Sequence, residues 1–134
     1  MRPMALVPAL IGIAVSAGAA FAQEAKDPGA EAYAQYCATC HGATGAGDGP
    51  LTEMMTASVP DLRTLTERHD GVFPMLEVIH IIDGRTGMRA HGGPMPVYGA
   101  LFVEESGGMT PYSDVLYSRG KVLSLAYFLE RIQQ

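Results

Sequence analysis

The sequence predicts one small all-α domain, and two segments with helical signals carry that prediction. In the first segment, Asp27 and Pro28 precede the alanine-rich run 30–40. An aspartate that caps backbone amides, followed by proline at the first helical position, is typical of a helix start. In the second segment, residues 115–132, apolar side chains recur at helical spacing with charged residues between them. The stripe comprises Val115, Val122, Leu123, Ala126, Leu129 and Ile132.

Residues 1–22 are expected to be a secretory signal peptide. Arg2 supplies a positive start, residues 5–21 are apolar and uncharged, and the segment ends in a small-x-small cleavage site at Ala22. We therefore expect cleavage after Ala22 and a periplasmic domain of residues 23–134. The alternative is an uncleaved anchor, although the apolar run is at the short limit for a membrane span. Nothing later in the sequence indicates a span.

The only two cysteines, Cys37 and Cys40, stand directly before His41. The pattern C-x-x-C-H is the attachment signature of a c-type haem. On one helical turn the two thiols share a face, so they can form thioether bonds along one edge of the porphyrin. The imidazole that follows can then bind the iron as its first axial ligand. The sequence therefore predicts one haem c, held by Cys37 and Cys40 and ligated by His41.

Three other uses of the cysteine pair are weaker. A disulfide is compatible with export. A redox-active pair belongs at the end of a strand in a βαβ unit, which the flanking residues do not resemble. A structural zinc site needs four ligands, and no second cysteine pair is present.

The charge of the chain argues against nucleic acid as a partner, because phosphate binding needs a basic face. The formal net charge is −5, and Lys26 and Lys121 are the only lysines. An acidic surface suits a partner protein with a basic docking patch, and it equally suits any acidic, water-soluble protein.

With these features the chain resembles the class I c-type cytochromes, the bacterial monohaem cytochrome c family. The likeness covers nearly all of residues 23–134: a helix leading into C-x-x-C-H, a glycine-rich loop, a methionine-bearing loop and a final helix. It implies the cytochrome c fold, with three to five helices wrapped around one covalently attached haem and the N- and C-terminal helices crossing.

The resemblance also implies particular contacts. Gly29 and Tyr33 are expected to pack against the C-terminal helix, close to Tyr127. Residues 74–82 could be helix or strand on composition alone. The family pattern favours a short helix, ended by Gly84.

The segment after the motif is predicted to be a loop, because four glycines fall within residues 42–49. It lacks the Lys-Ser/Thr pair of a phosphate-binding loop. The resemblance implies that a proline carbonyl in this loop accepts a hydrogen bond from His41, and Pro50 is the candidate. A short helix within residues 51–58 and a Pro-Asp-Leu turn at 60–62 are expected next.

Met95 is predicted to be the second axial ligand. Pro94 and Pro96 exclude a helix interior or a central strand and stiffen the loop around it. A thioether suits low-spin iron and favours the reduced state. The alternatives are the loop methionines Met88 and Met109 and the histidines His69, His80 and His91, whereas Met54, Met55 and Met75 are expected in the core. Arg85, Arg89 and His91 are candidates for contacts with haem propionates.

If His41 and Met95 fill both axial positions, the iron has no open site for a substrate. The expected function is then single-electron transfer between redox partner proteins, with no enzymatic activity of its own. One alternative is a haem subunit of a larger exported dehydrogenase or oxidase, which an exposed apolar patch at residues 101–103 would favour. The other is a five-coordinate, ligand-binding haem protein. Residues 101–111 are expected to form an additional polar loop.

Overall fold

The structure is a computed structural model that describes residues 26–85, 93–108 and 110–134. In these ranges all regular structure is helical and no strand occurs, so the predicted all-α fold is confirmed. No described helix has the length and apolar character needed to cross a membrane. The α-helices are α1 (Pro28–Tyr36), α2 (Ala38–His41), α3 (Met75–Asp83), α4 (Tyr98–Glu105) and α5 (Pro111–Arg131), and short 3-10 helices span Thr52–Met54, Leu62–Thr64 and Glu67–His69.

The helix ends follow the local sequence. Asp27 caps α1, as predicted: its carboxylate accepts a hydrogen bond of 2.9 Å from the amide of Gly29. The helical run expected to reach residue 40 is interrupted at Cys37, so the motif begins at the junction of α1 and α2. The predicted helix over residues 74–82 is α3, and Gly84 ends it at φ 82°.

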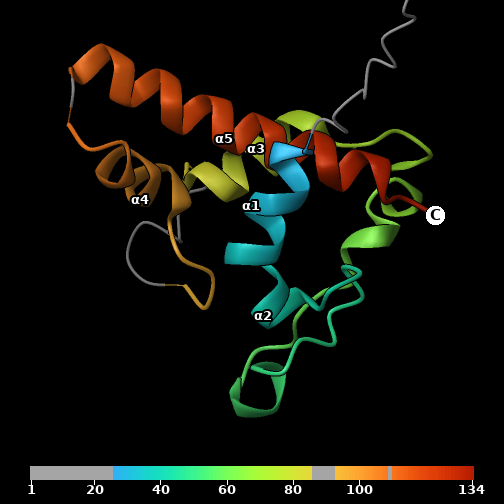
Figure 1. Cartoon of the computed structure of the whole chain (residues 1–134). Coiled ribbons are helices and arrows are strands. Elements are labelled where there is room, and N and C mark those ends of the chain that lie inside the picture. The colour runs from blue at the N-terminus through green and yellow to red at the C-terminus, as the bar shows by residue number, and fades with distance from the viewer. Residues whose placement is uncertain (1–25, 86–92, 109) are drawn as a thin grey trace, which may run out of the picture.

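Helices α1 and α5 cross, as the family resemblance implies (Figure 1). Gly29 makes this close approach possible, because a methyl group there would collide with the backbone carbonyl of Ser124 on α5. The ring of Tyr33 packs against Phe128 at a centroid distance of 4.8 Å. The expected contact with Tyr127 is wrong: that side chain lies on another face of α5 and is half-exposed.

The expected polar loop at residues 101–111 is in part the helix α4. Phe102 is fully buried, and the Ser118 hydroxyl on α5 donates to the carbonyl of Gly99 at 2.8 Å. Lys121 on α5 forms an ion pair with Glu105 at 2.7 Å. These contacts hold α4 against α5. Tertiary packing therefore makes this segment helical, although its glycines and charged residues are typical of a loop.

The core lies where α1, α3, α4 and α5 meet. Of the predicted stripe on α5, Val122, Ala126 and Leu129 are buried, whereas Val115 and Leu123 are exposed. Leu125, outside the predicted stripe, is fully buried. The apolar side chains of α5 therefore occupy two faces, and only one of them belongs to the core.

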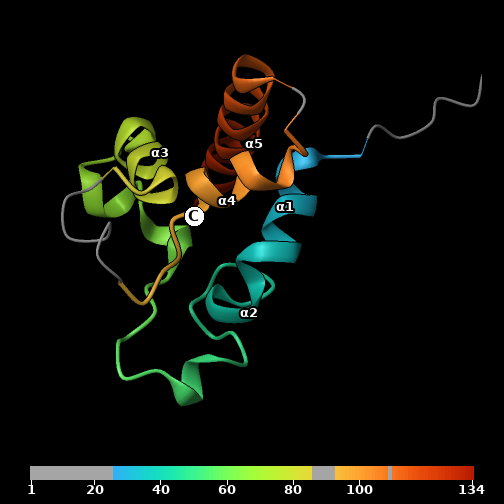
Figure 2. The same cartoon turned by 90° about the vertical axis from the view of Figure 1, so that its left-hand side faces the viewer.

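The first part of the chain between α2 and α3, around the 3-10 turn Thr52–Met54, projects away from this helical core (Figure 2), whereas Leu62, Leu65 and Phe73 in its second part pack against the core. The expected helix at residues 51–58 is only the single 3-10 turn Thr52–Met54. Met54 lies on this projection and is 77% exposed, so its expected place in the core is wrong. Met75, at the start of α3, is partly buried against the core, as expected.

Candidate functional site

The four predicted site residues line one cavity of about 370 Å³. Cys37, Cys40 and His41 reach it from the end of α1 and from α2, and Met95 reaches it from the segment before α4. Figure 2 shows these two segments below α4 and α5. Most of the remaining lining is apolar and includes Leu62, Leu65, Val78, Ile82, Leu125 and Leu129. The structure therefore brings together side chains from segments far apart in the sequence.

The two thiols lie one helical turn apart on the cavity wall. The amides of Cys40 and His41 both donate to the carbonyl of Cys37, at 3.1 and 2.8 Å, which fixes this turn. The cysteines are half-buried and not bonded to each other. Burial, and secondarily the neighbouring Cys40, raises the pKa of the Cys37 thiol to about 12. A thiol with a raised pKa is a poor redox nucleophile, which disfavours a redox-active pair.

A structural zinc site is also disfavoured by the surroundings of the pair. Within the described part of the chain, no group of three or more His, Cys, Asp or Glu side chains is arranged to hold a metal ion. The site instead fits a covalently attached porphyrin. Two thiols lie on one turn beside an apolar cavity, and an imidazole and a thioether belong to the lining of that cavity.

His41 is oriented by Pro60, and the expectation that Pro50 would do so is wrong. Its Nδ1 lies 3.4 Å from the carbonyl oxygen of Pro60. The amide of Leu62 donates to Gly45 at 2.7 Å, which holds the Pro-Asp-Leu turn beside the motif. Pro50 is exposed and lies between Gly49 and Leu51, whose amides bond back to the backbone of α2.

This contact sets the chemistry of the imidazole. With Nδ1–H donating to the Pro60 carbonyl, Nε2 keeps the lone pair that a metal needs. Burial lowers the pKa of His41, and the bond to Pro60 opposes that shift in part. The ring is therefore neutral near pH 7, the state in which histidine binds iron.

Met95 is half-buried and packs against the core as well as lining the cavity. Met55 also lines the cavity, although the sequence pattern placed it in the core. The place of Met55 on the cavity wall was not predicted, because Met55 lies in the long projecting segment and no local sequence pattern specifies the path of that segment. The candidates Met88, His91, Arg89 and Met109 lie outside the described residues.

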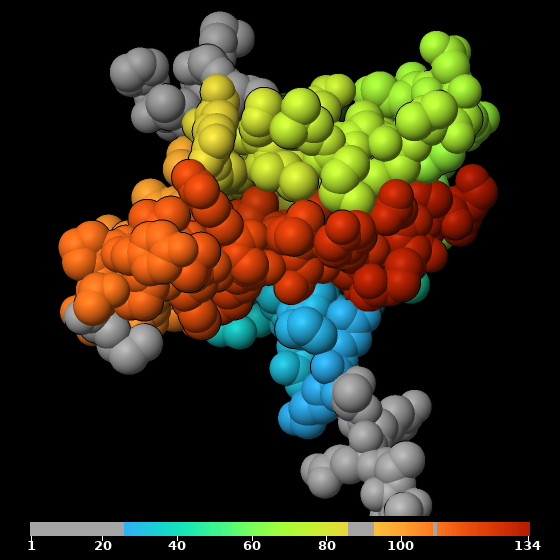
Figure 3. Space-filling model, turned by 90° about the horizontal axis from the view of Figure 1, so that it is seen from above, coloured from blue at the N-terminus to red at the C-terminus, as the bar shows by residue number. Residues whose placement is uncertain are grey.

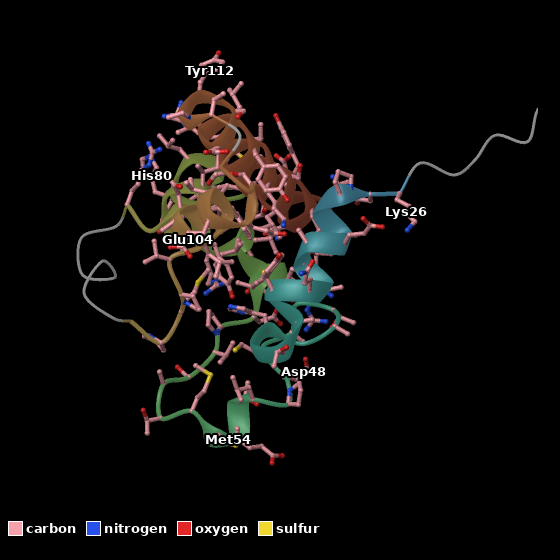
Figure 4. The ribbon with its side chains drawn as sticks, turned by 60° about the vertical axis from the view of Figure 1, so that its left-hand side comes forward. Lys26, Asp48, Met54, His80, Glu104 and Tyr112 are labelled. Carbon is pink, nitrogen blue, oxygen red and sulfur yellow. The ribbon has the colours of Figure 1, made fainter. Side chains whose placement is uncertain are left out.

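The two remaining histidines differ in position. His69 lines the cavity, but its Nδ1 is 2.7 Å from the carbonyl of Leu65 and its Nε2 is 3.3 Å from Glu77, so both ring nitrogens have partners. His80, on α3, is not part of the lining (Figure 4). Neither is as well placed as Met95 to be a second ligand.

Charged side chains at the cavity differ from those predicted. Arg85 pairs with Asp83 and does not line the cavity. Arg68 does line it, with one guanidinium nitrogen donating to the carbonyl of Asp61 at 2.6 Å. Arg68 belongs to a 3-10 turn that the sequence pattern does not reveal.

Two buried tyrosines fasten the backbone on either side of the motif. The hydroxyl of Tyr98 donates to the carbonyl of Tyr36 at 2.6 Å, just before Cys37. The hydroxyl of Tyr33 donates to the carbonyl of Gly42 at 2.7 Å, just after His41. Both rings also line the cavity. The wall of the cavity thus also holds the C-x-x-C-H motif in place.

Comparison with known proteins agrees with this geometry. Residues 24–104 match the family described as cytochrome c oxidase, cbb3-type, subunit III. The match covers more than half of the chain and includes the C-x-x-C-H motif and Met95. No curated protein and no solved structure matches the chain. The predicted class I c-type cytochrome is confirmed: the chain belongs to this family of c-type cytochrome domains, which implies covalently bound haem c and haem-based electron transfer.

Proposed function

We propose that this protein is a periplasmic carrier of single electrons. One haem c would be attached through Cys37 and Cys40, with His41 and Met95 as its axial ligands. The observation that supports this proposal is that the imidazole, the thioether and both thiols line the same apolar cavity. The haem, when bound, supplies the one-electron redox chemistry, and the protein supplies ligation and burial.

The side chains of the cavity would each contribute to that chemistry. The Pro60 carbonyl keeps His41 in one tautomer and makes its Nε2 more basic. Met95 would offer a neutral sulfur, and the apolar lining would shield the haem from water; both would favour the reduced iron. If His41 and Met95 both bind the iron, no coordination position would remain for a substrate, which favours a carrier over an enzyme.

The proposed location rests on the predicted signal peptide. Residues 1–22 have the charge, apolar run and cleavage site of an exported protein. Covalent haem attachment in bacteria takes place outside the cytoplasmic membrane, so the C-x-x-C-H motif and the predicted signal peptide both indicate export. The donor and acceptor would be proteins that meet the carrier through small, weak interfaces.

The axial ligation can be tested with two methionine substitutions, because Met55 lines the same cavity as Met95. Visible spectra of the oxidised protein are expected to show low-spin iron with the far-red band of methionine–iron ligation. Met95→Ala should abolish that band, whereas the matched control Met55→Ala should retain it. Loss of the band in Met55→Ala alone would overturn the assignment of Met95 as a ligand. High-spin iron in the wild-type protein would overturn the proposal that the protein is an electron carrier.

A second candidate function is a haem subunit of a larger exported oxidoreductase. Two observations favour it: the family is described as an oxidase subunit, and Leu101 and Val103 are exposed apolar side chains on α4. This candidate predicts that the tagged protein copurifies stoichiometrically with a larger chain. That complex should be lost on substitution of Leu101 by lysine, whereas a free carrier would be recovered alone.

A further inference from the structure

Helix α5 carries a second apolar stripe, on the side away from the core. Tyr112, Leu116, Leu123 and Tyr127 are 75%, 51%, 40% and 48% exposed. At 100° per residue these four side chains share one face of the helix. Figure 3 looks down on α5, whose surface is open along its length between α3 and α1. Figure 4 shows Tyr112 pointing away from the rest of the molecule.

The stripe reads the same in both directions along the helix. Its order is Tyr, Leu, Leu, Tyr, with spacings of four, seven and four residues. Two identical helices that pair antiparallel around a two-fold axis contact each other through the same patch. In that arrangement Tyr112 would face Tyr127 of the second copy, and Leu116 would face Leu123 of the second copy. The stripe is therefore complementary to itself.

Gly120 lies next to the centre of this stripe. A glycine in a helix interior lowers helix stability, and no packing contact explains it here: no heavy atom lies within 4 Å of the position that its Cβ would occupy. At the midpoint of a helix pair, however, the missing side chain lets two backbones approach closely. The glycine thus has a role between two copies that it lacks within one.

We propose that the exposed face of α5 is a dimer interface, covered by a second copy of this chain in antiparallel orientation. This inference goes beyond the proposed electron transfer and does not depend on the axial ligands. It leaves the haem cavity accessible, because α5 contributes to that cavity through Leu125 and Leu129, on its other side.

The area of the stripe indicates a weak, reversible dimer. A tyrosine side chain buries roughly 150–250 Å² when covered, so the exposed parts of Tyr112 and Tyr127 offer on the order of 200 Å² per copy. With the two leucines and their neighbours, both copies together would bury roughly 1,000 Å², about the lower limit for a specific interface. An interface at this limit is expected to dissociate on dilution.

Salt should strengthen this association. Each copy is acidic, with a formal charge of −5 for the full sequence, and Arg119 of both copies would lie close to the two-fold axis. Screening reduces both repulsions, while burial of apolar surface is little affected. A docking site for an oppositely charged partner protein would show the reverse dependence.

The test is the oligomeric state of the haem-loaded wild-type protein, measured by analytical ultracentrifugation over a range of concentrations and salt. Wild type is expected to pass from one chain to two as concentration rises, and more readily at high salt. Leu116→Glu and Leu123→Lys should each be monomeric. A mixture of these two variants should dimerise again, because in the antiparallel pair the introduced carboxylate faces the introduced amine.

The control is Leu76→Glu, which changes an exposed leucine on α3, away from the stripe, and should dimerise like wild type. Unchanged visible spectra and circular dichroism would show that the variants are folded. A wild type that stays monomeric at all concentrations, or binds only a different chain, would overturn the proposal. So would a mixture that associates no better than its single components.

Discussion

Single residues hold the attachment motif from both ends. Tyr98 and Tyr33 each donate one hydrogen bond to a backbone carbonyl, on either side of Cys37 to His41. Burial is the largest cause that raises the pKa of both phenols, from an ordinary 10 to about 12. Each hydrogen bond needs the neutral hydroxyl as its donor. The geometry of the motif therefore depends on the protonation of these two tyrosines.

This linkage predicts an alkaline transition. Because the folded-state pKa values lie above the unfolded value, the stabilisation by both tyrosines is complete below about pH 10 and is lost as the pH rises towards 12. The free energy of unfolding of the haem-loaded protein, measured by chemical denaturation, should fall steeply in that window. Tyr98→Phe should make the fall shallower. Tyr112→Phe, at a position exposed in the single chain, should not change it when the protein is dilute enough to be monomeric. An equally steep fall in Tyr98→Phe would refute the linkage.

At the scale of secondary-structure elements, two helix glycines have opposite surroundings. Gly29 on α1 faces the backbone of α5, and a methyl group there would collide with the Ser124 carbonyl. Gly120 on α5 has open space where a methyl group would be. The first glycine is required by a packed contact, whereas within a single copy of the chain the second has no such contact and weakens its own helix.

The same substitution should therefore have opposite effects at the two glycines. Gly29→Ala is expected to destabilise the protein by about 1–3 kcal/mol, because two helices must move apart. Gly120→Ala should stabilise the monomer by about 0.5–1 kcal/mol, since alanine is the better helix former. Thermal unfolding at a dilution that keeps the protein monomeric measures both values. Destabilisation by both substitutions would show that the surroundings of Gly120 are not open.

Features whose determinants are local were predictable from the sequence. The Asp27 cap, the end of α3 at Gly84 and the C-x-x-C-H turn each depend on residues within one or two turns, whereas the choice of helix over strand for α3 came from the family resemblance. The choice of Pro60 over Pro50 depends on how a long projecting segment folds back, through the bond from Leu62 to Gly45. No pattern of a few residues encodes that path.

Contacts between elements were predicted less well for the same reason. Helix α4 owes its place to Phe102, Ser118 and the Lys121–Glu105 pair, which act across elements. The aromatic partner of Tyr33 proved to be Phe128 and not Tyr127, because a shift of one residue turns a side chain by 100° around the helix. Because α5 also has a second apolar face, the predicted stripe included the exposed Leu123 and omitted the buried Leu125.

At the scale of the whole molecule, the haem would complete the core. The cavity is lined by helices and by the segments around Val59 and Met95, and its lining is mostly apolar. A haem in the cavity would cover apolar surface that water contacts in its absence, and each methylene group buried in this way contributes about 0.8 kcal/mol. Folding of this chain and attachment of its cofactor are therefore expected to be coupled.

Removal of the haem tests that coupling. The double variant Cys37→Ser/Cys40→Ser, exported without covalent haem, should show reduced helical circular dichroism and no cooperative thermal transition. The control is the haem-loaded Leu76→Glu variant, whose substitution lies outside the cavity. It should keep the helical circular dichroism and the cooperative transition of wild type. A cooperative transition in the serine variant, close to that of wild type, would show that the helices pack without the cofactor.

The most direct test of the central claim is the exposure of the reduced wild-type protein to carbon monoxide. If His41 and Met95 both ligate the iron, the visible spectrum should not change, because no axial position is open. The Met95→Ala variant, measured in parallel, should bind carbon monoxide at once. Immediate binding by wild type would contradict the account, since the protein would then be a ligand-binding haem protein and not an electron carrier.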